Sequence, residues 1–236
     1  EEVINEAALS SMDDDTLYRQ LNYLWRNYCI SNTYEPGSTI KPFTAAAGLE
    51  SGALSGNETY ECAGSLTVVA GEKPIKCHNV YGDGVLTISQ AIERSCNVAL
   101  MKMGQTIGET TLLKYLEDFN FGLKTNIDLA GEARTASLVF TEDTMGPTEL
   151  ATTTFGQGFN VTMIQTITGF CALINSGYYY EPNMVSHITS SDGTVVVNIE
   201  QRLLNTLCCE ETSAALRDAG ILASAGASER LPTSTE

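Results

Sequence analysis

The sequence predicts one helix-rich domain of the α/β (α+β) class, with short β-hairpins, over residues 1–236. Apolar residues recur at helical spacing in several segments, which indicates amphipathic helices. Glycine and β-branched residues gather between these segments, as is typical of short strands and turns. Hydrophobic residues make up 43% of the chain, enough for one sizeable core.

The predicted helices follow from this spacing. Within residues 1–30, Leu17, Leu21, Leu24 and Trp25 share one face of a helix. Pro36-Gly37 breaks the chain and starts the next helix. In chain order, the further expected helices cover residues 38–49, 87–94, 98–107, 110–119 and 163–175.

Strands are expected in two regions. The β-branched run at residues 66–69 predicts one strand, and residues 185–188 with 194–199 predict a hairpin closed by Ser191-Asp192-Gly193. Residues 149–158 are polar and contain glycine, so we expect no helix there. The tail after residue 217 shows no strong period.

The composition and charge of the chain argue against some classes of function. The formal net charge of −16 argues against nucleic-acid binding, which requires a basic surface. No apolar run approaches the roughly 20 residues that cross a bilayer. Because the sequence begins with Glu1 and shows no signal peptide, we expect a piece of a longer protein, with any membrane anchor outside it.

Ser38 and Lys41 form the first candidate catalytic pair. Residues three apart on a helix share a face, so the hydroxyl and the amine can meet. Serine needs a neighbouring base, and a lysine serves when burial keeps part of it neutral. A Ser-x-x-Lys pattern arises about once by chance in a chain of this length. The flanking Pro-Gly and Pro-Phe-Thr make this instance more specific.

Ser95-Cys96-Asn97 is the second candidate, at a junction between two predicted helices. The Ser95 hydroxyl can relay a proton, and the Asn97 amide can hold both the lysine and a substrate carbonyl. Ser55-Gly56-Asn57 matches the same pattern, but its glycine-rich surroundings favour a turn.

The chain has seven cysteines, so at least one thiol is free. Cys62 and Cys77 flank a glycine-rich stretch, and the sequence leaves open a disulfide between them or two buried thiols. Cys77-His78 lacks the second ligand pair of a zinc site, so no metal and no other cofactor is expected.

Four blocks together resemble the class B penicillin-binding proteins, in particular the division and sporulation transpeptidases of Gram-positive bacteria. The resemblance covers about residues 21–217. The blocks occur in the family's order: residues 34–44 (YEPGSTIKPFT), 86–103 (LTISQAIERSCNVALMKM), 121–133 (FGLKTNIDLAGEA) and 151–162 (ATTTFGQGFNVT). The resemblance implies a β-lactamase/transpeptidase-like fold, of which this chain holds mainly the helix-rich part and an incomplete central sheet.

The resemblance implies acyl transfer at the extracytoplasmic face of the bacterial membrane. Ser38 would attack the D-Ala-D-Ala end of a peptidoglycan stem peptide, and an amine of a second stem peptide would take the acyl group. Lys41 would act as base, with Ser95 and Asn97 as relay and orienting groups. β-Lactam antibiotics would acylate Ser38, and other cell-wall synthesis proteins are possible partners.

The resemblance assigns substrate binding to Gly156, Gln157 and Gly158. The family's third motif, Lys-Thr-Gly, does not occur in the sequence. An alignment of residues 222–232 (LASAGASERLP) with this region would put Ser224 and Gly226 in its place, as weak substrate-binding candidates.

Three functions are therefore open: a D,D-transpeptidase, a degenerate or truncated relative that acts through protein contacts, or a serine β-lactamase or penicillin sensor. The missing third motif favours the second function, whereas the intact Ser38, Lys41, Ser95 and Asn97 favour the first. No deacylating carboxylate stands beside Ser38 in the sequence, which disfavours the third.

Overall fold

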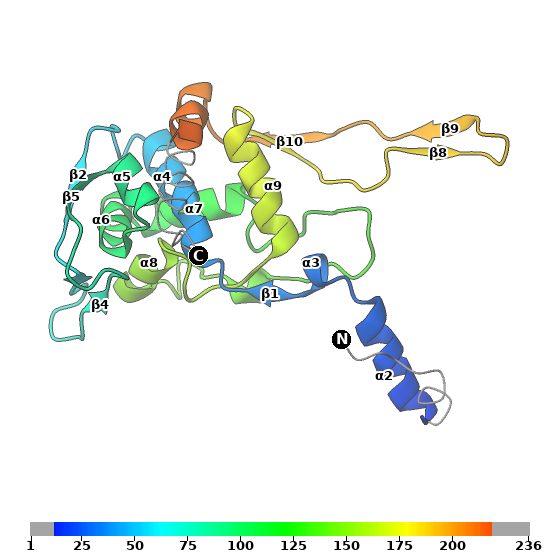
Figure 1. Cartoon of the computed structure of the whole chain (residues 1–236), viewed down its shortest axis with the longest axis horizontal. Helices are drawn as coiled ribbons and strands as arrows, with labels where there is room; N and C mark the ends of the chain where they lie inside the picture. Colours follow the sequence, from blue (N-terminus) through cyan, green and yellow to red (C-terminus); the bar gives the residue numbers. More distant parts are fainter. Residues whose placement is uncertain (1–11, 219–236) are drawn as a thin grey trace, which may run out of the picture.

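The computed structural model describes residues 12–218 of the chain. Helices α4 (Lys41–Glu50), α5 (Ile88–Glu93), α6 (Asn97–Ile107), α7 (Glu109–Asp118) and α8 (Pro147–Thr153) gather in one body beside α9 (Met163–Ile174) (Figure 1). Helix α2 (Asp14–Trp25) and a hairpin of β8 (His187–Thr189) and β9 (Val195–Asn198) project from this body (Figure 1).

Helix α4 lies in the centre of the core and is buried on almost every side. Small residues make this possible, because Ala45, Ala46 and Ala47 are fully buried and let α6 and α7 pack closely. A Cβ on Gly48 would meet Leu54 Cδ1 at 2.4 Å, so this position has no room for a larger residue. The helix therefore carries its first residue, Lys41, into the interior.

Every sheet in the described residues is an antiparallel pair of strands. The pairs are β1 (Thr33–Tyr34) with β6 (Val161–Thr162), β2 (Thr59–Cys62) with β5 (Gly84–Thr87), β3 (Ser65–Leu66) with β4 (Ile75–Lys76), β7 (Tyr178–Tyr180) with β10 (Leu203–Thr206), and β8 with β9. The predicted mixed class with helices and short hairpins is confirmed.

The helices expected at residues 38–49, 87–94, 98–107, 110–119 and 163–175 all form, with small shifts at their ends. The first of them begins as a 3-10 turn, η1 (Gly37–Ile40), that runs into α4. The predicted helix with Leu17 and Trp25 is α2, but none of its residues is buried. The 185–199 hairpin forms as well.

Two local predictions are wrong. The strand expected at residues 66–69 ends at Leu66, because β3 pairs only with the two residues of β4. The sequence predicts no helix at residues 149–158, yet α8 covers part of them. Its threonine-rich sequence has low helix propensity, and burial of Ala151 and Thr153 stabilises it instead. None of the helices within residues 12–218 combines the length and apolarity needed to cross a membrane.

Candidate active site

Ser38 is the second residue of η1, so it stands in a first turn whose backbone N–H groups have no acceptor within the helix. Such groups are suited to stabilising a developing oxyanion. Ser38 is exposed, whereas Lys41, one turn later, is only 1% exposed. The chain can make this turn because Gly37 adopts a positive φ of 58°.

Lys41 makes three hydrogen bonds, all to the second motif. Its Nζ donates to Ser95 O at 2.6 Å, to Ser95 Oγ at 2.8 Å and to Asn97 Oδ1 at 2.8 Å. These acceptors satisfy the three N–H groups of an ammonium. Helices α4 and α6 therefore join the first and second motifs into one network.

Burial lowers the pKa of Lys41 to about 8, although nearby Cys77 and Cys96 act in the opposite direction. Desolvation disfavours the charged form of an amine, which explains the direction of the shift. At neutral pH about one tenth of the amine is then unprotonated, compared with less than about one thousandth at an ordinary lysine pKa. Lys41 can thus accept a proton near physiological pH.

Ser95 connects this amine to the nucleophile. Its Oγ lies 2.8 Å from Ser38 Oγ, which completes a continuous chain from Lys41 Nζ through Ser95 Oγ to Ser38 Oγ. Ser95 also has a positive φ of 53°, a conformation that is costly for a non-glycine residue and that often marks functional sites.

The helix junction around Ser95 is well defined on both sides. Helix α5 begins with a capping box, in which the Thr87 side chain accepts from Gln90 N and the Gln90 side chain accepts from Thr87 N. Helix α6 begins directly after Cys96, whose backbone N–H donates to Ala91 O. Two rigid helices therefore fix the position of the turn that bears Ser95.

Gly156 lies against the turn that bears the nucleophile. Its carbonyl accepts from Gly37 N at 2.9 Å, and a Cβ at Gly156 would meet Gly37 O at 2.1 Å. Gly158 N donates to Glu35 Oε1, a contact that the sequence did not reveal because the two residues are 123 positions apart. Gln157 and Gly158 are exposed. The segment at residues 156–158 thus supports the chain just before Ser38.

The second Ser-x-Asn pattern makes no hydrogen bond to this network. Ser224 and Gly226 lie outside the described residues. Ser55-Gly56-Asn57 lies in a loop that bends at Gly56, in which the Glu58 carboxylate accepts from the backbone N–H groups of Ser55 and Gly56. Those hydrogen bonds lower the pKa of Glu58.

Cys62 and Cys77 are buried free thiols, so the second of the two alternatives left open holds. They flank the hairpin of β3 and β4 without a bond to each other. Instead both lie near Asp83 and Cys96, a group that the sequence spacing did not reveal.

The family model described as "Penicillin binding protein transpeptidase domain" matches residues 5–217. The chain belongs to this family. The resemblance noted in the sequence is thereby confirmed. The matched region includes Ser38 and Lys41. The structure brings Ser38, Lys41, Ser95 and Asn97 together, as the family resemblance implied.

Several relatives are similar in sequence. Stage V sporulation protein D of Bacillus subtilis is 38% identical over 157 residues, which are 66% of this chain and 24% of that protein. The peptidoglycan D,D-transpeptidase MrdA of Escherichia coli is 27% identical over 202 residues, 80% of this chain and 31% of that protein. The chain spans roughly a quarter of the length of the first relatives that it matches.

Solved structures of the same fold match most of the chain. Penicillin-binding protein 2X of Streptococcus thermophilus has a TM-score of 0.73 and 25% identity, over 84% of this chain and 28% of that one. The D,D-transpeptidase domain from Eggerthella lenta has a TM-score of 0.79 and 23% identity, over 97% of this chain and 56% of that one. The predicted β-lactamase/transpeptidase-like fold is confirmed.

Proposed function

We propose that the chain carries the acylation centre of a peptidoglycan D,D-transpeptidase, with Ser38 as nucleophile and Lys41 as base. The observation that carries this proposal is the hydrogen-bonded chain from Lys41 Nζ through Ser95 Oγ to Ser38 Oγ. Lys41 is buried and its pKa is lowered to about 8 by desolvation, so its amine is available as a base.

The first step forms an ester and breaks an amide. Ser38 Oγ attacks the carbonyl between the two terminal D-alanines, its proton passes to Ser95 Oγ, and the Ser95 proton passes to Lys41 Nζ. The tetrahedral intermediate collapses when the leaving D-alanine amine takes a proton back from this relay. The Ser38 ester remains.

The second step regenerates the enzyme. An amine of a neighbouring stem peptide attacks the ester carbonyl and loses its proton to the relay, and Ser38 leaves as a hydroxyl. Asn97 holds Lys41 during both steps through its Oδ1, and its amide N–H group is available to a substrate carbonyl.

The remaining assignments belong to the same proposal. The segment Gly156–Gln157–Gly158 would contact the substrate beside Ser38, and β-lactams would acylate Ser38 as analogues of the D-Ala-D-Ala end. One solved structure of the same fold, penicillin-binding protein A of Mycobacterium tuberculosis, is an imipenem acyl-enzyme complex. Cell-wall synthesis at the extracytoplasmic face of the membrane is the expected setting.

Labelling with a fluorescent penicillin tests the proposal. We expect a stable covalent adduct that Ser38→Ala abolishes and that Ser55→Ala, a matched exposed serine in a second Ser-x-Asn pattern, leaves intact. Rapid turnover of the drug would instead support a serine β-lactamase. A folded chain without any adduct would support a relative that acts through protein contacts.

A further inference from the structure

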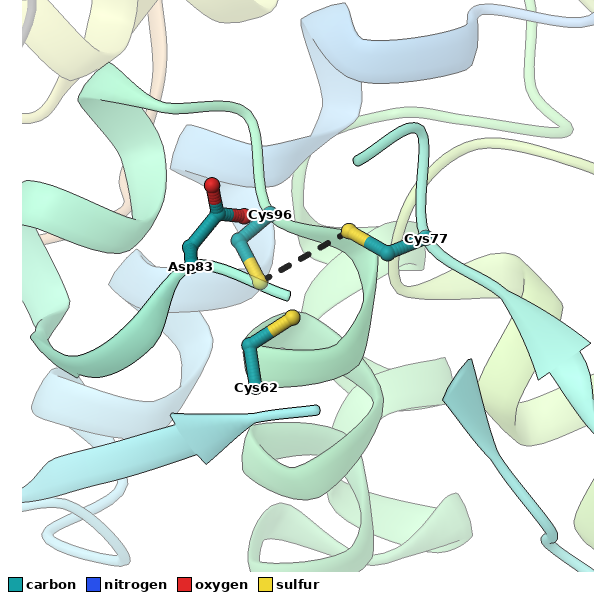
Figure 2. Close-up of side chains that lie close together, drawn as sticks. All are labelled: Cys62, Cys77, Asp83 and Cys96. Atoms are coloured by element: carbon teal, nitrogen blue, oxygen red, sulfur yellow. Dashed lines mark hydrogen bonds between the residues drawn. The ribbon is translucent and has the colours of Figure 1, made fainter. Parts of the chain in front are cut away.

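Behind the second motif, four side chains with metal-binding groups converge from four separate elements (Figure 2). Cys62 is the last residue of β2, Cys77 directly follows β4, Asp83 directly precedes β5, and Cys96 caps the N-terminus of α6. Their ligand atoms all lie within 4.8 Å of one another. The cluster is thus independent of any local sequence motif.

The distances fit a tetrahedral ion. Cys77 Sγ and Cys96 Sγ are 3.8 Å apart. A tetrahedral zinc site with Zn–S bonds of about 2.3 Å places two sulfur atoms about 3.8 Å apart, whereas a disulfide needs about 2.05 Å. The largest separation in the cluster requires a contraction of only about 1 Å on metal binding.

Three of the four side chains in the cluster are buried, Asp83 is half-buried, and one oxygen atom of Asp83 lacks a partner. Cys62, Cys77 and Cys96 are 2%, 3% and 0% exposed. Asp83 Oδ2 is buried and has no hydrogen-bond partner, which is costly for a carboxylate. Asp83 Oδ1, in contrast, accepts from Asn79 Nδ2 at 2.9 Å, so the carboxylate is oriented as second-sphere partners orient metal ligands.

The backbone holds the ligand-bearing loops in place. Cys77 N donates to Gly64 O at 2.8 Å, and Asn79 Nδ2 also donates to Gly82 O at 2.9 Å. At Gly82, which has a positive φ of 87°, a Cβ would meet Cys62 O at 2.3 Å. The loops before and after the strand pair therefore approach one another closely enough only because this residue is glycine.

We propose that Cys62, Cys77, Cys96 and Asp83 bind one Zn²⁺ ion. Three sulfur ligands select a borderline-soft ion over Mg²⁺ or Ca²⁺, and a set of four protein ligands is that of a structural site. Binding forms three Zn–S bonds and one Zn–O bond, and the three thiol protons pass to solvent. The sequence alone predicts no metal site, because these ligands are scattered over different elements.

The ion would stabilise the turn at residues 95–97. Cys96 stands between Ser95 and Asn97, so a metal bond to its sulfur would hold the strained Ser95 backbone and the first turn of α6 together. This effect on the active site rests on the proposed function, but metal binding itself does not.

Metal analysis of the purified full chain tests the site. Under reducing conditions we expect about one zinc per chain after exposure to Zn²⁺ and dialysis. Replacement by Co²⁺ should give thiolate-to-cobalt charge-transfer absorption and the visible bands of a tetrahedral ion. These readouts use the unaltered chain and are independent of penicillin labelling. Zinc below about one tenth of an equivalent, or no thiolate-to-cobalt band, would overturn the proposal.

Variants locate the ion. Cys62→Ser and Asp83→Ala should each lower the bound zinc by at least about tenfold, whereas Cys171→Ser, an exposed cysteine outside the cluster, should keep it. Circular dichroism checks that each variant folds. Zinc retained by folded Cys62→Ser, or a Cys77–Cys96 disulfide found by peptide mapping in protein prepared with zinc and reductant, would contradict the site. Zinc binding without penicillin labelling would refute only the proposed function.

Discussion

Two clusters of polar side chains share the turn at residues 95–97, and they differ in how many of their polar groups have hydrogen-bond partners. On one side, all three N–H groups of Lys41 have acceptors on Ser95 and Asn97. On the other side, the Asp83 side chain lies beside three thiols, and its buried Oδ2 has no hydrogen-bond partner. The first cluster leaves no N–H group of Lys41 unpaired, whereas the second leaves a buried carboxylate oxygen that the proposed cation would satisfy.

The difference shows how one short segment can serve two tasks. Ser95 and Asn97 contribute to the Lys41 network, while Cys96, between them, contributes its sulfur to the other cluster. If both proposals hold, damage to the Lys41 network should leave zinc content unchanged, whereas loss of zinc should affect labelling only through the backbone of Ser95. Penicillin labelling and zinc content are therefore separate readouts of the two clusters.

Replacement of the base should have the largest effect on the catalytic side. Lys41→Met keeps the volume of the buried side chain but removes the amine, so we expect penicillin acylation to slow by about 10²–10⁴-fold. Stopped-flow or quenched labelling measures this rate. Lys73→Met, at an exposed lysine, is the matched control and should acylate normally. Zinc content should not change in either variant, and a fully active Lys41→Met would refute the role of Lys41.

Substitutions at two glycines, one beside each cluster, should destabilise the structure around that cluster. Gly156→Ala would press a Cβ onto Gly37 O, and Gly82→Ala would press one onto Cys62 O, each at a positive φ. We expect both variants to lower the free energy of unfolding by about 2–4 kcal/mol in denaturant titrations. Gly71→Ala, with a similar φ but open space around it, should cost about 1 kcal/mol.

The same glycine variants should differ in function. Gly156→Ala should slow penicillin labelling and retain zinc, whereas Gly82→Ala should lose zinc more readily than it loses labelling. Equal losses of both readouts in both variants would mean that the two clusters are not separable.

The pH dependence should report the burial of Lys41. Its pKa is lowered to about 8 by desolvation, so the neutral amine is present above about pH 8 and is lost as the pH falls below it. Between pH 6 and pH 8 we expect the acylation rate to rise by about 50-fold and then to level off. A rate that keeps rising to about pH 10 would instead indicate an ordinary, solvated lysine.

The smallest expected effect concerns the second sphere of the thiol cluster. Asn79→Ala removes the hydrogen bond to Asp83 Oδ1, so zinc affinity should fall by about 10–100-fold in competition with a chromophoric chelator. Asn57→Ala, at an exposed loop asparagine, is the control. Penicillin labelling of both variants should stay close to that of the unaltered chain. An unchanged affinity in Asn79→Ala would remove Asn79 from the site.

How well each feature could be predicted from the sequence depended on how far apart in the chain its interacting residues lie. The helices at residues 87–94 and 98–107 were predictable because one amphipathic period specifies each of them. Helix α8 was not, because its threonine-rich sequence gives little local preference and its burial against α6 decides the outcome. The disposition of Cys62 and Cys77 was open for a similar reason, since their neighbours Asp83 and Cys96 come from other elements.

By itself, the sequence determined that Ser38 and Lys41 share one turn, because helical geometry brings residues three apart onto one face whatever surrounds them. It also determined the family, through ordered blocks that chance does not supply. Only the tertiary structure decided that Lys41 is buried, that Ser95 bridges it to a nucleophile 57 residues away, and that four ligand groups meet behind that bridge. Burial and contacts between distant segments depend on how the elements pack, and local spacing carries no information about packing.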